Sequence, residues 1–444
     1  MNCDQARTEI IAYLKGELGT EAKQRLEEHL ARCPNCRHEL DGARRLLSWT
    51  EAASQEAVVK TVEETIDGAI AAGASDIHWE PQRDNTLQVR YRVDGVLHVV
   101  ATHDSVMRQG IVSRVKMLAD MNMSETSTPQ DGRIPWKLHD QPKEYDIRVA
   151  SSPFIFGEGF VMRILDRSSV LVGLDRLGFY PDHMKSLTEI ASQPNGLLVI
   201  GGPTGSGKTT TIYSLLMHLI SPERKVLTIE DPVEYQIPGA NQVQVHKKVG
   251  LTFAAGLRSF LRHDPDIIYL GEMRDLETAM IAVEAAITGH LVITSLHTND
   301  AVSSFVRLVD MGVEPYLIAA TMIGAVNQRL ARKVCANCKE EAELDLTGPV
   351  ARFLGITAED LADHKIYRGN GCEVCRGTGY KGRTGVYEIL RVTKDLASMI
   401  IDRPPLRELK DAATAGGFAP MREDAKRKVL DGITTPEEVF RILV

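Results

Sequence analysis

At residues 202–209 the chain reads Gly202-Pro203-Thr204-Gly205-Ser206-Gly207-Lys208-Thr209, which fits the phosphate-binding pattern GxxxxGK followed by Ser or Thr. An apolar run of strand type, Leu197–Gly201, precedes it, and Thr210–Leu219 has helical character. In this arrangement backbone N–H groups, the helix dipole and Lys208 converge on phosphate oxygens, and the Thr209 hydroxyl can ligate Mg²⁺. We therefore predict that residues 202–210 bind ATP or GTP with Mg²⁺. A glycine turn that binds nothing would leave Lys208 unexplained.

The composition of the 444 residues is that of a globular protein with room for roughly three domains. The net charge of −8 does not favour direct contact with nucleic acid. The sequence contains no apolar run of the ~18 residues that a membrane-spanning helix needs, and its N-terminus does not have the pattern of a signal peptide. We therefore expect a cytoplasmic protein.

Four of the seven cysteines lie in the C-terminal part of the chain and form two CxxC pairs there, Cys335 with Cys338 and Cys372 with Cys375. Each pair places two thiolates on one side of a tight turn, and two pairs complete the tetrahedral shell of a Zn²⁺ ion. We predict a structural zinc subdomain over residues 333–384, since four thiolates leave no open position for catalysis. A redox-active CxxC pair is the alternative.

The other three cysteines lie near the N-terminus, where His29, Cys33 and Cys36 form the pattern HxxxCxxC. His29 and Cys33 are spaced four residues apart on an expected helix and so point the same way. Cys36 can join them after a turn at Pro34-Asn35, and Cys3 can supply a fourth ligand. A domain of ~40 residues has little core of its own, so a second zinc ion is physically reasonable. The alternative is a small core in which the His and Cys side chains only pack.

Residue patterns divide the rest of the chain into further segments. Alternating strand-like runs with an Asp94-Gly95 hairpin signal predict an α+β domain, and alternating strand and helix patterns predict a parallel α/β sheet after it. The expected organisation is a zinc finger over 1–40, a linker over 41–57, the α+β domain over 58–168, the α/β core over 169–332, the zinc subdomain over 333–384 and a mostly helical region over 385–444.

Three strand-like runs within the α/β core end in polar residues. Glu230 to Glu234 follow the first run, Gly271-Glu272 follow the second, and His297 follows the third. Side chains at the carboxyl ends of sheet strands can lie beside bound phosphates. Each run by itself could be a strand end with solvated charges, but their order after the P-loop favours one nucleotide site.

These motifs together resemble those of secretion-superfamily ATPases of the type II secretion and type IV pilus assembly branch. The resemblance covers residues ~58–444, and the four-cysteine module favours the assembly or secretion motors over retraction motors. Residues 1–40 resemble a zinc finger of the anti-sigma-factor type. The matching segments include Ala74–His78, Tyr91–Gly95, Gln130–Arg133, the P-loop, Glu230–Glu234, Gly271-Glu272 and His297.

The resemblance implies a RecA-like ATPase domain preceded by a PAS-like α+β domain. Lys208 and Thr209 would bind phosphate and Mg²⁺, Glu234 would act as general base, Glu272 would coordinate Mg²⁺ through water, and His297 would read the nucleotide state. Arg133 and Arg148 match arginines that reach the nucleotide in the assembled ring. Ordinary surface ion pairs are the alternative for these two arginines.

The family also implies partners. We expect a homo-hexamer at the cytoplasmic side of the inner membrane that powers assembly of type IV pili or a type II secretion pseudopilus through an inner-membrane platform protein. The short finger replaces the larger N-terminal domain of many relatives, so its protein partner is open. The alternatives are an ATP-regulated binding protein of the anti-sigma type and a DNA-uptake or translocation ATPase.

Overall fold

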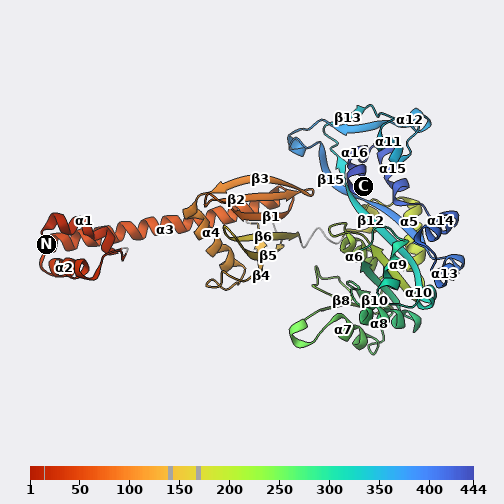
Figure 1. The fold of residues 1–444 in the computed structure, drawn as a ribbon, viewed down its shortest axis with the longest axis horizontal. Coiled ribbons are helices and arrows are strands. Elements are labelled where there is room, and N and C mark those ends of the chain that lie inside the picture. Colours follow the sequence, from red (N-terminus) through yellow and green to blue (C-terminus); the bar gives the residue numbers. More distant parts are fainter. Residues whose placement is uncertain (15, 139–143, 167–171) are drawn as a thin grey trace. The chain divides into compact units, whose positions relative to one another are not determined.

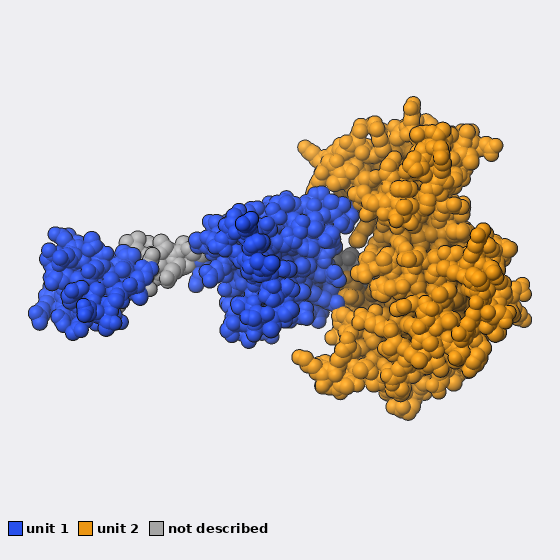
Figure 2. Space-filling model, in the orientation of Figure 1, with its two compact units in different colours: residues 1–167 blue, residues 168–444 orange. Residues whose placement is uncertain are grey.

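The computed structural model describes residues 1–14, 16–138, 144–166 and 172–444, with side chains for all of these except 44–54 and 166. The chain divides into two compact units, residues 1–167 and 168–444, which Figure 2 shows in separate colours. The predicted domain boundary at 168/169 lies outside the described residues. None of the described helices combines the length and the hydropathy needed to cross a bilayer.

The N-terminal region is built from three helices, α1 (Cys3–Leu14), α2 (Thr20–Arg32) and α3 (Pro34–Ala71). A small core joins the three helices, with Ala6, Ile10, Leu26, Leu30, Cys36 and Leu40 buried. Helix α3 runs through the whole segment 41–57, which was expected to be a connecting helix or linker. The reason is compositional, because this segment is rich in Ala, Arg, Leu, Glu and Gln and contains no proline.

The rest of the first unit is a six-stranded antiparallel sheet in the order β3-β2-β1-β6-β5-β4 (Figure 1). The predicted hairpin between β2 and β3 is confirmed, since Asp94 and Gly95 both have positive φ angles, as a type I′ turn requires. The C-terminal part of α3 and helix α4 (Ser105–Leu118) pack their apolar side chains on the sheet. The strands are β1 (Ala74–Pro81), β2 (Leu87–Val93), β3 (Val96–His103), β4 (Gln130–Lys137), β5 (Glu144–Phe154) and β6 (Gly157–Asp166).

The second unit is organised around a seven-stranded sheet in the order β15-β12-β7-β11-β10-β8-β9. Six neighbouring strands are parallel, and β15 is antiparallel to β12. The central strands are fully buried, as expected for a parallel sheet with both faces covered. The strands are β7 (Gly196–Gly201), β8 (Val226–Glu230), β9 (Ala240–Gln244), β10 (Ile267–Leu270), β11 (Leu291–Leu296), β12 (Met322–Val334) and β15 (Tyr380–Arg391).

Helices cover both faces of this sheet, so the predicted α/β class is confirmed. On one face α5 and α6 pack against the strands, and on the other face α7 to α10 form the core with α13 and α14. The helices are α5 (Pro181–Ala191), α6 (Lys208–Leu219), α7 (Phe253–Phe260), α8 (Leu276–Ile287), α9 (Ser303–Asp310), α10 (Pro315–Thr321), α13 (Lys394–Ile401) and α14 (Leu406–Ala415), with 3₁₀ turns η1 (Leu174–Arg176) and η2 (Lys247–Val249).

The region 385–444, expected to be mostly helical, contains four helices, but its first residues, 385–391, are the end of strand β15. Short apolar runs are ambiguous between helix and strand, and here β12 supplies the neighbouring ladder. The four-cysteine module shares a core with the last two helices. Its elements are β13 (Lys339–Ala342), α11 (Pro349–Leu354), α12 (Ala358–Asp363), β14 (Ile366–Gly369) and η3 (Glu373–Cys375), and the last helices are α15 (Met421–Leu430) and α16 (Pro436–Leu443).

Candidate functional site

The P-loop, residues 202–209, connects β7 to α6, and Lys208 is the first residue of that helix. Gly207 precedes the helix with a φ of 88°, a left-handed conformation that favours glycine. At Gly202 a Cβ atom would lie 2.5 Å from the Ser206 hydroxyl and 2.7 Å from the Gln328 carbonyl oxygen. The backbone therefore follows a course that leaves no room for a side chain at this position.

The Lys208 ammonium is turned onto the P-loop itself. Its Nζ donates hydrogen bonds to the carbonyl oxygens of Gly202 at 2.7 Å and Pro203 at 3.0 Å. Burial lowers the pKa of Lys208 to about 8; Glu272 acts against this shift and Arg329 adds to it. A phosphate group beside Lys208 would favour the charged form, so the site is electrostatically prepared for an anion.

A polar cavity of about 150 Å³ brings several of the predicted residues together. Thr209 of the P-loop, Glu234 from the segment between β8 and β9, and Glu272 after β10 all line it. The strands end beside this cavity with their carboxyl termini, the usual place for ligands in an α/β sheet. The other lining residues are Glu230, Asp231, Pro232, Phe253, Tyr269, Gly271 and Ser295.

His297 directly follows β11. The charges of Lys208 and Glu272 shift the pKa of its imidazole. Burial lowers its pKa, Lys208 lowers it further, and Glu272 acts in the opposite direction. The imidazole is therefore neutral at pH 7 and can donate one hydrogen bond and accept another. Glu272 forms an ion pair with the exposed guanidinium of Arg274.

A hydrogen-bond network around Glu230, the first residue of the predicted acidic segment, includes Tyr213 and Gln242, which the sequence patterns missed. Glu230 is buried and accepts hydrogen bonds from Thr228 at 2.7 Å, Gln242 at 3.1 Å and the Tyr213 hydroxyl. Burial raises the pKa of Glu230. The backbone N–H of Glu234 donates to the same Tyr213 hydroxyl at 3.3 Å. No pattern indicated Tyr213, because a tyrosine within a helix next to a P-loop has no distinctive spacing.

Three consecutive polar residues of β12 also contact the P-loop and the loop that follows β11. Gln328 donates to the carbonyl oxygen of Ser206 at 2.7 Å, and Asn327 donates to Thr298 at 3.0 Å. Arg329 donates to the carbonyl oxygen of Asn299 at 3.1 Å. Such a polar triplet directly after the apolar run 322–326 is a signal that could have identified these residues.

The two predicted arginines belong to the other compact unit. Arg133 on β4 and Arg148 on β5 are direct partners in the antiparallel ladder. The Arg133 guanidinium makes two hydrogen bonds to the carboxylate of buried Asp146, yet its side chain is 58% exposed. Arg133 thus forms an ion pair while keeping accessible surface.

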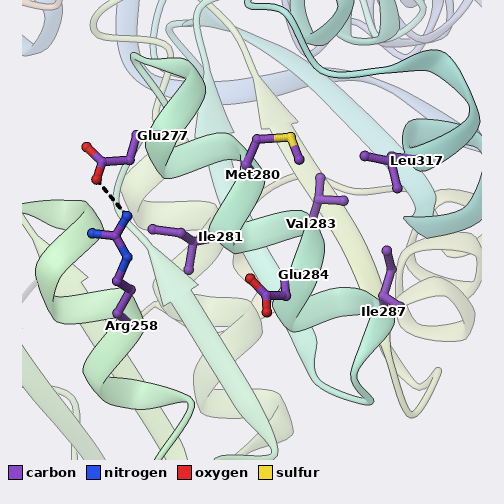
Figure 3. A pocket seen from close by; sticks show the side chains of 8 residues that line it. All are labelled: Arg258, Glu277, Met280, Ile281, Val283, Glu284, Ile287 and Leu317. Carbon is purple, nitrogen blue, oxygen red and sulfur yellow. Dashed lines mark hydrogen bonds and ion pairs between the residues drawn. The ribbon is translucent and has the colours of Figure 1, made fainter.

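A second hollow of about 450 Å³ lies between α7, α8 and α10 (Figure 3). Its walls are mainly apolar, with Met280, Ile281, Val283, Ile287 and Leu317, and Arg258 forms an ion pair with Glu277 at its edge. It includes none of the residues predicted for the nucleotide site.

Cys3, His29, Cys33 and Cys36 form a cluster in which all four candidate ligand atoms lie within 4.8 Å of one another. The Sγ atoms of Cys3 and Cys33 are 3.8 Å apart, and His29 Nε2 is 3.3 Å from Cys36 Sγ. Sulfur atoms around a tetrahedral Zn²⁺ at about 2.3 Å would be about 3.8 Å apart. The residues therefore fit a zinc ion.

The second cluster joins Cys335, Cys338, Cys372 and Cys375, again within 4.8 Å. The sulfur–sulfur distances are 3.9 Å between Cys335 and Cys372 and 3.7 Å between Cys338 and Cys375. The N–H groups of Cys372 and Gly379 donate to the Cys375 sulfur at 3.1 and 3.3 Å, which orients the thiolate. This geometry also fits zinc.

We predict two zinc ions per chain by metal analysis of the purified protein, because each cluster offers a complete four-ligand shell. Deletion of residues 1–40 should leave one zinc ion. Cys3→Ser in the full chain should weaken zinc retention at the first cluster against a chelator and leave the second occupied. If the full chain contains one zinc ion and the deletion does not change this number, residues 3–36 hold no metal.

Comparison with known proteins agrees with this geometry. Residues 51–441 match the family model described as type II/IV secretion system protein, and residues 3–37 match that of a zinc-finger family. The chain is 45% identical over 394 residues to the type IV pilus assembly ATPase PilB of Thermus thermophilus, covering 89% of this chain and 43% of that protein. It is 43% identical over 385 residues to the type II secretion system protein HxcR of Pseudomonas aeruginosa, covering 87% of this chain and 77% of that one.

The fold is similar to that of a solved structure, the ATPase DotB of Legionella pneumophila. The TM-score is 0.63 at 21% sequence identity, and the alignment covers 86% of this chain and 94% of DotB. Fold and site together define a P-loop protein of the α/β class. The chain belongs to the family of type II/IV secretion system proteins. It spans less than half the length of the Thermus thermophilus relative.

Proposed function

We propose that this protein hydrolyses ATP and uses the free energy to assemble a type IV pilus or a type II secretion pseudopilus. The observation that carries the proposal is the cavity in which the P-loop residue Thr209 meets two carboxylates, Glu234 and Glu272. The relatives named as pilus assembly and type II secretion proteins support the choice of process. The work would be done on an inner-membrane platform protein from the cytoplasmic side.

In this proposal each site residue has a defined task. Lys208 and the P-loop N–H groups bind the β- and γ-phosphates, and Thr209 and Glu272 hold Mg²⁺, Glu272 through water. The metal would neutralise charge on the phosphate oxygens. Glu234 accepts a proton from the attacking water as the new P–O bond forms and the bond to ADP breaks. Neutral His297 exchanges hydrogen bonds with the nucleotide and so reads its state.

We further propose a RecA-like ATPase core, a PAS-like antiparallel sheet domain, and assembly as a homo-hexamer. Arg133 and Arg148 would complete a nucleotide site in the ring. The exposed guanidinium of Arg133 supports this role. Arginines on a separate unit would make hydrolysis depend on domain position, because phosphoryl transfer needs charge stabilisation in the transition state.

The test is the dependence of ATPase activity on both units. Residues 170–444 alone are expected to bind nucleotide but to hydrolyse it slowly. In the full chain Arg133→Ala or Arg148→Ala should lower kcat more than nucleotide affinity, because the transition state carries more charge to stabilise than the ground state. Specific activity should rise with protein concentration as rings form. Phosphate release measured across a dilution series checks all of these.

Arg163→Ala is the matched control for the arginine variants. Arg163 lies opposite Arg148 in the ladder and pairs with buried Asp76 at 3.1 Å, so its loss costs a comparable ion pair. We expect turnover close to wild type for this variant. Undiminished, concentration-independent activity of the 170–444 fragment would show that neither the arginines nor the ring is needed.

Two other functions are tested by the same assay. A DNA translocase would be stimulated by added DNA, and a regulatory ATP-binding protein would bind nucleotide without multiple turnovers. The zinc finger is proposed to bind a protein partner in either case. Crosslinking with residues 1–55 as bait would identify that partner.

A further inference from the structure

The loop after β11, residues 297–302, is held by hydrogen bonds and an ion pair to side chains from the C-terminal part of the chain. We name it the His297 loop. Each of four consecutive loop residues has a contact with a different C-terminal residue. These contacts are Asn327 to Thr298 at 3.0 Å, Arg329 to the Asn299 carbonyl at 3.1 Å, Lys410 to Asp300 at 2.8 Å and Glu388 to the Ala301 N–H at 2.6 Å.

Glu388 on β15 is a buried carboxylate among these contacts, with 3% of its surface exposed. One carboxylate oxygen accepts from the N–H of Ala301 at 2.6 Å, and the other accepts from the N–H of Met421 at 2.8 Å. Met421 is the first residue of α15. Hydrogen bonds from N–H groups to a carboxylate are short and stronger than neutral ones. Glu388 thus joins the His297 loop to the N-terminus of a C-terminal helix.

The same pair of strands also reaches the P-loop. Asn327 on β12 is the direct ladder partner of Glu388 on β15. The next residue, Gln328, is buried and donates to the carbonyl oxygen of Ser206 in the P-loop at 2.7 Å. The two strands therefore fix the positions of the P-loop and the His297 loop relative to each other.

We propose that Glu388 is a positioning residue for ATP hydrolysis. It holds the His297 loop in the position needed for catalysis and connects the loop to the N-terminus of helix α15. This inference rests on the proposed function, since its effect is read out in ATP turnover. Glu388 does not line the nucleotide cavity, so it acts through His297 and the loop backbone. The P-loop keeps its own support from Gln328, and nucleotide binding should change little when Glu388 is altered.

Glu388→Gln in the full chain tests the proposal. Glutamine keeps the shape and one acceptor, but its NH₂ group faces one of the two N–H donors and breaks that bond. We expect kcat to fall by on the order of 10- to 100-fold, the scale of a small displacement of catalytic groups. KM and the affinity for a fluorescent ADP analogue should stay near wild type. Thermal melting is recorded in parallel.

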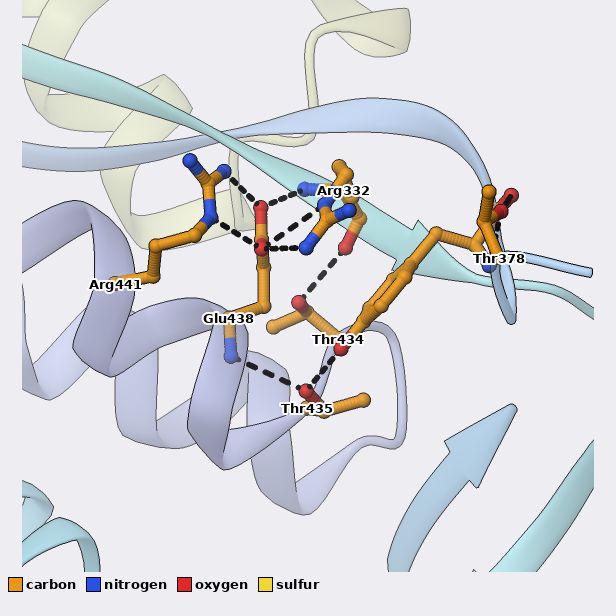
Figure 4. Close-up of polar contacts among 7 residues, drawn as sticks. Arg332, Thr378, Thr434, Thr435, Glu438 and Arg441 are labelled. Atoms are coloured by element: carbon orange, nitrogen blue, oxygen red, sulfur yellow. Dashed lines mark hydrogen bonds and ion pairs between the residues drawn. The ribbon is translucent and has the colours of Figure 1, made fainter. Parts of the chain in front are cut away.

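Glu438→Gln is the matched control (Figure 4). Glu438 on α16 is 1% exposed and accepts hydrogen bonds from the Arg332 backbone at 2.9 Å, from the Arg332 guanidinium at 2.7 Å and from Arg441. Like Glu388, it is therefore a buried carboxylate that accepts a backbone hydrogen bond from another element, but its partners belong neither to the P-loop nor to the His297 loop. We expect a lower Tm and unchanged kcat for this variant.

The outcomes separate the two claims. Loss of kcat in Glu388→Gln with retained turnover in Glu438→Gln supports the positioning role, and loss in both in proportion to Tm overturns it. Wild-type turnover in Glu388→Gln also overturns it, while absence of turnover in the wild-type chain contradicts the proposed function itself. If Glu388→Gln does not fold, the Lys410→Ala variant tests the proposal in its place, because Lys410 contacts Asp300 of the same loop. This half-exposed lysine can be removed without a cavity, and its loss should lower kcat at constant KM; an unchanged kcat refutes the proposal.

Discussion

Lys208→Ala is expected to reduce ATP turnover to background and to weaken nucleotide binding by roughly 10- to 100-fold, the scale of lost hydrogen bonds to a charged group. The ammonium is held at the P-loop by the carbonyl oxygens of Gly202 and Pro203, where it can turn to the phosphates. Lys208 is the first residue of α6. Phosphate release and titration with a fluorescent ADP analogue measure the two effects.

The pH dependence of binding gives a second readout for Lys208. The pKa of Lys208 is lowered to about 8 by burial in the nucleotide-free protein. Bound phosphates raise this pKa, so above pH 8 binding requires uptake of a proton and affinity falls by up to about tenfold per pH unit. Below pH 8 this group contributes no pH dependence. His297 is already neutral throughout this range, since its pKa is lowered.

The alanine variant should lose this fall in affinity above pH 8. Lys185→Ala, which removes an exposed lysine from α5, should keep both the pH dependence and the turnover of the wild type. A Lys208→Ala variant that hydrolyses ATP normally would mean that the P-loop lysine has no part in catalysis. One that binds weakly but retains the alkaline fall would assign the titration to another group.

Glu234→Gln is expected to slow turnover at least ~100-fold while nucleotide binding stays largely intact, because the amide cannot accept the proton of the attacking water. Glu234 lines the cavity together with Thr209, and its backbone is held by the Tyr213 hydroxyl. Single-turnover hydrolysis measured beside equilibrium binding separates the chemical step from affinity.

Two neighbouring carboxylates provide the comparison. Asp231 lines the same cavity but is paired with Lys247 at 3.1 Å, so Asp231→Asn should have a much smaller effect. Glu272→Gln should affect the Mg²⁺ requirement more than the proton transfer. If Glu234→Gln turns over normally and Glu272→Gln does not, Glu272 is the base.

Local features of the sequence were sufficient for the parts of the protein that depend on near neighbours. The P-loop is one run of residues between a strand and a helix, and the Asp94-Gly95 hairpin needs only two residues with positive φ angles. The CxxC spacings predicted thiolate pairs, because a tight turn determines where both sulfur atoms point. The family followed from the order of these motifs, and the comparisons confirm it.

Only the tertiary structure decided which distant residues meet. Residues 385–391 are a strand because β12 offers its edge, and the Cys335 and Cys372 pairs, 37 positions apart, come together through the surrounding fold. The contact of Tyr213 with Glu230 and that of Glu388 with Ala301 span 17 and 87 positions. Periodicity and spacing describe one element at a time, whereas these contacts depend on the order of strands in the sheet, which arises from burial of all the elements together.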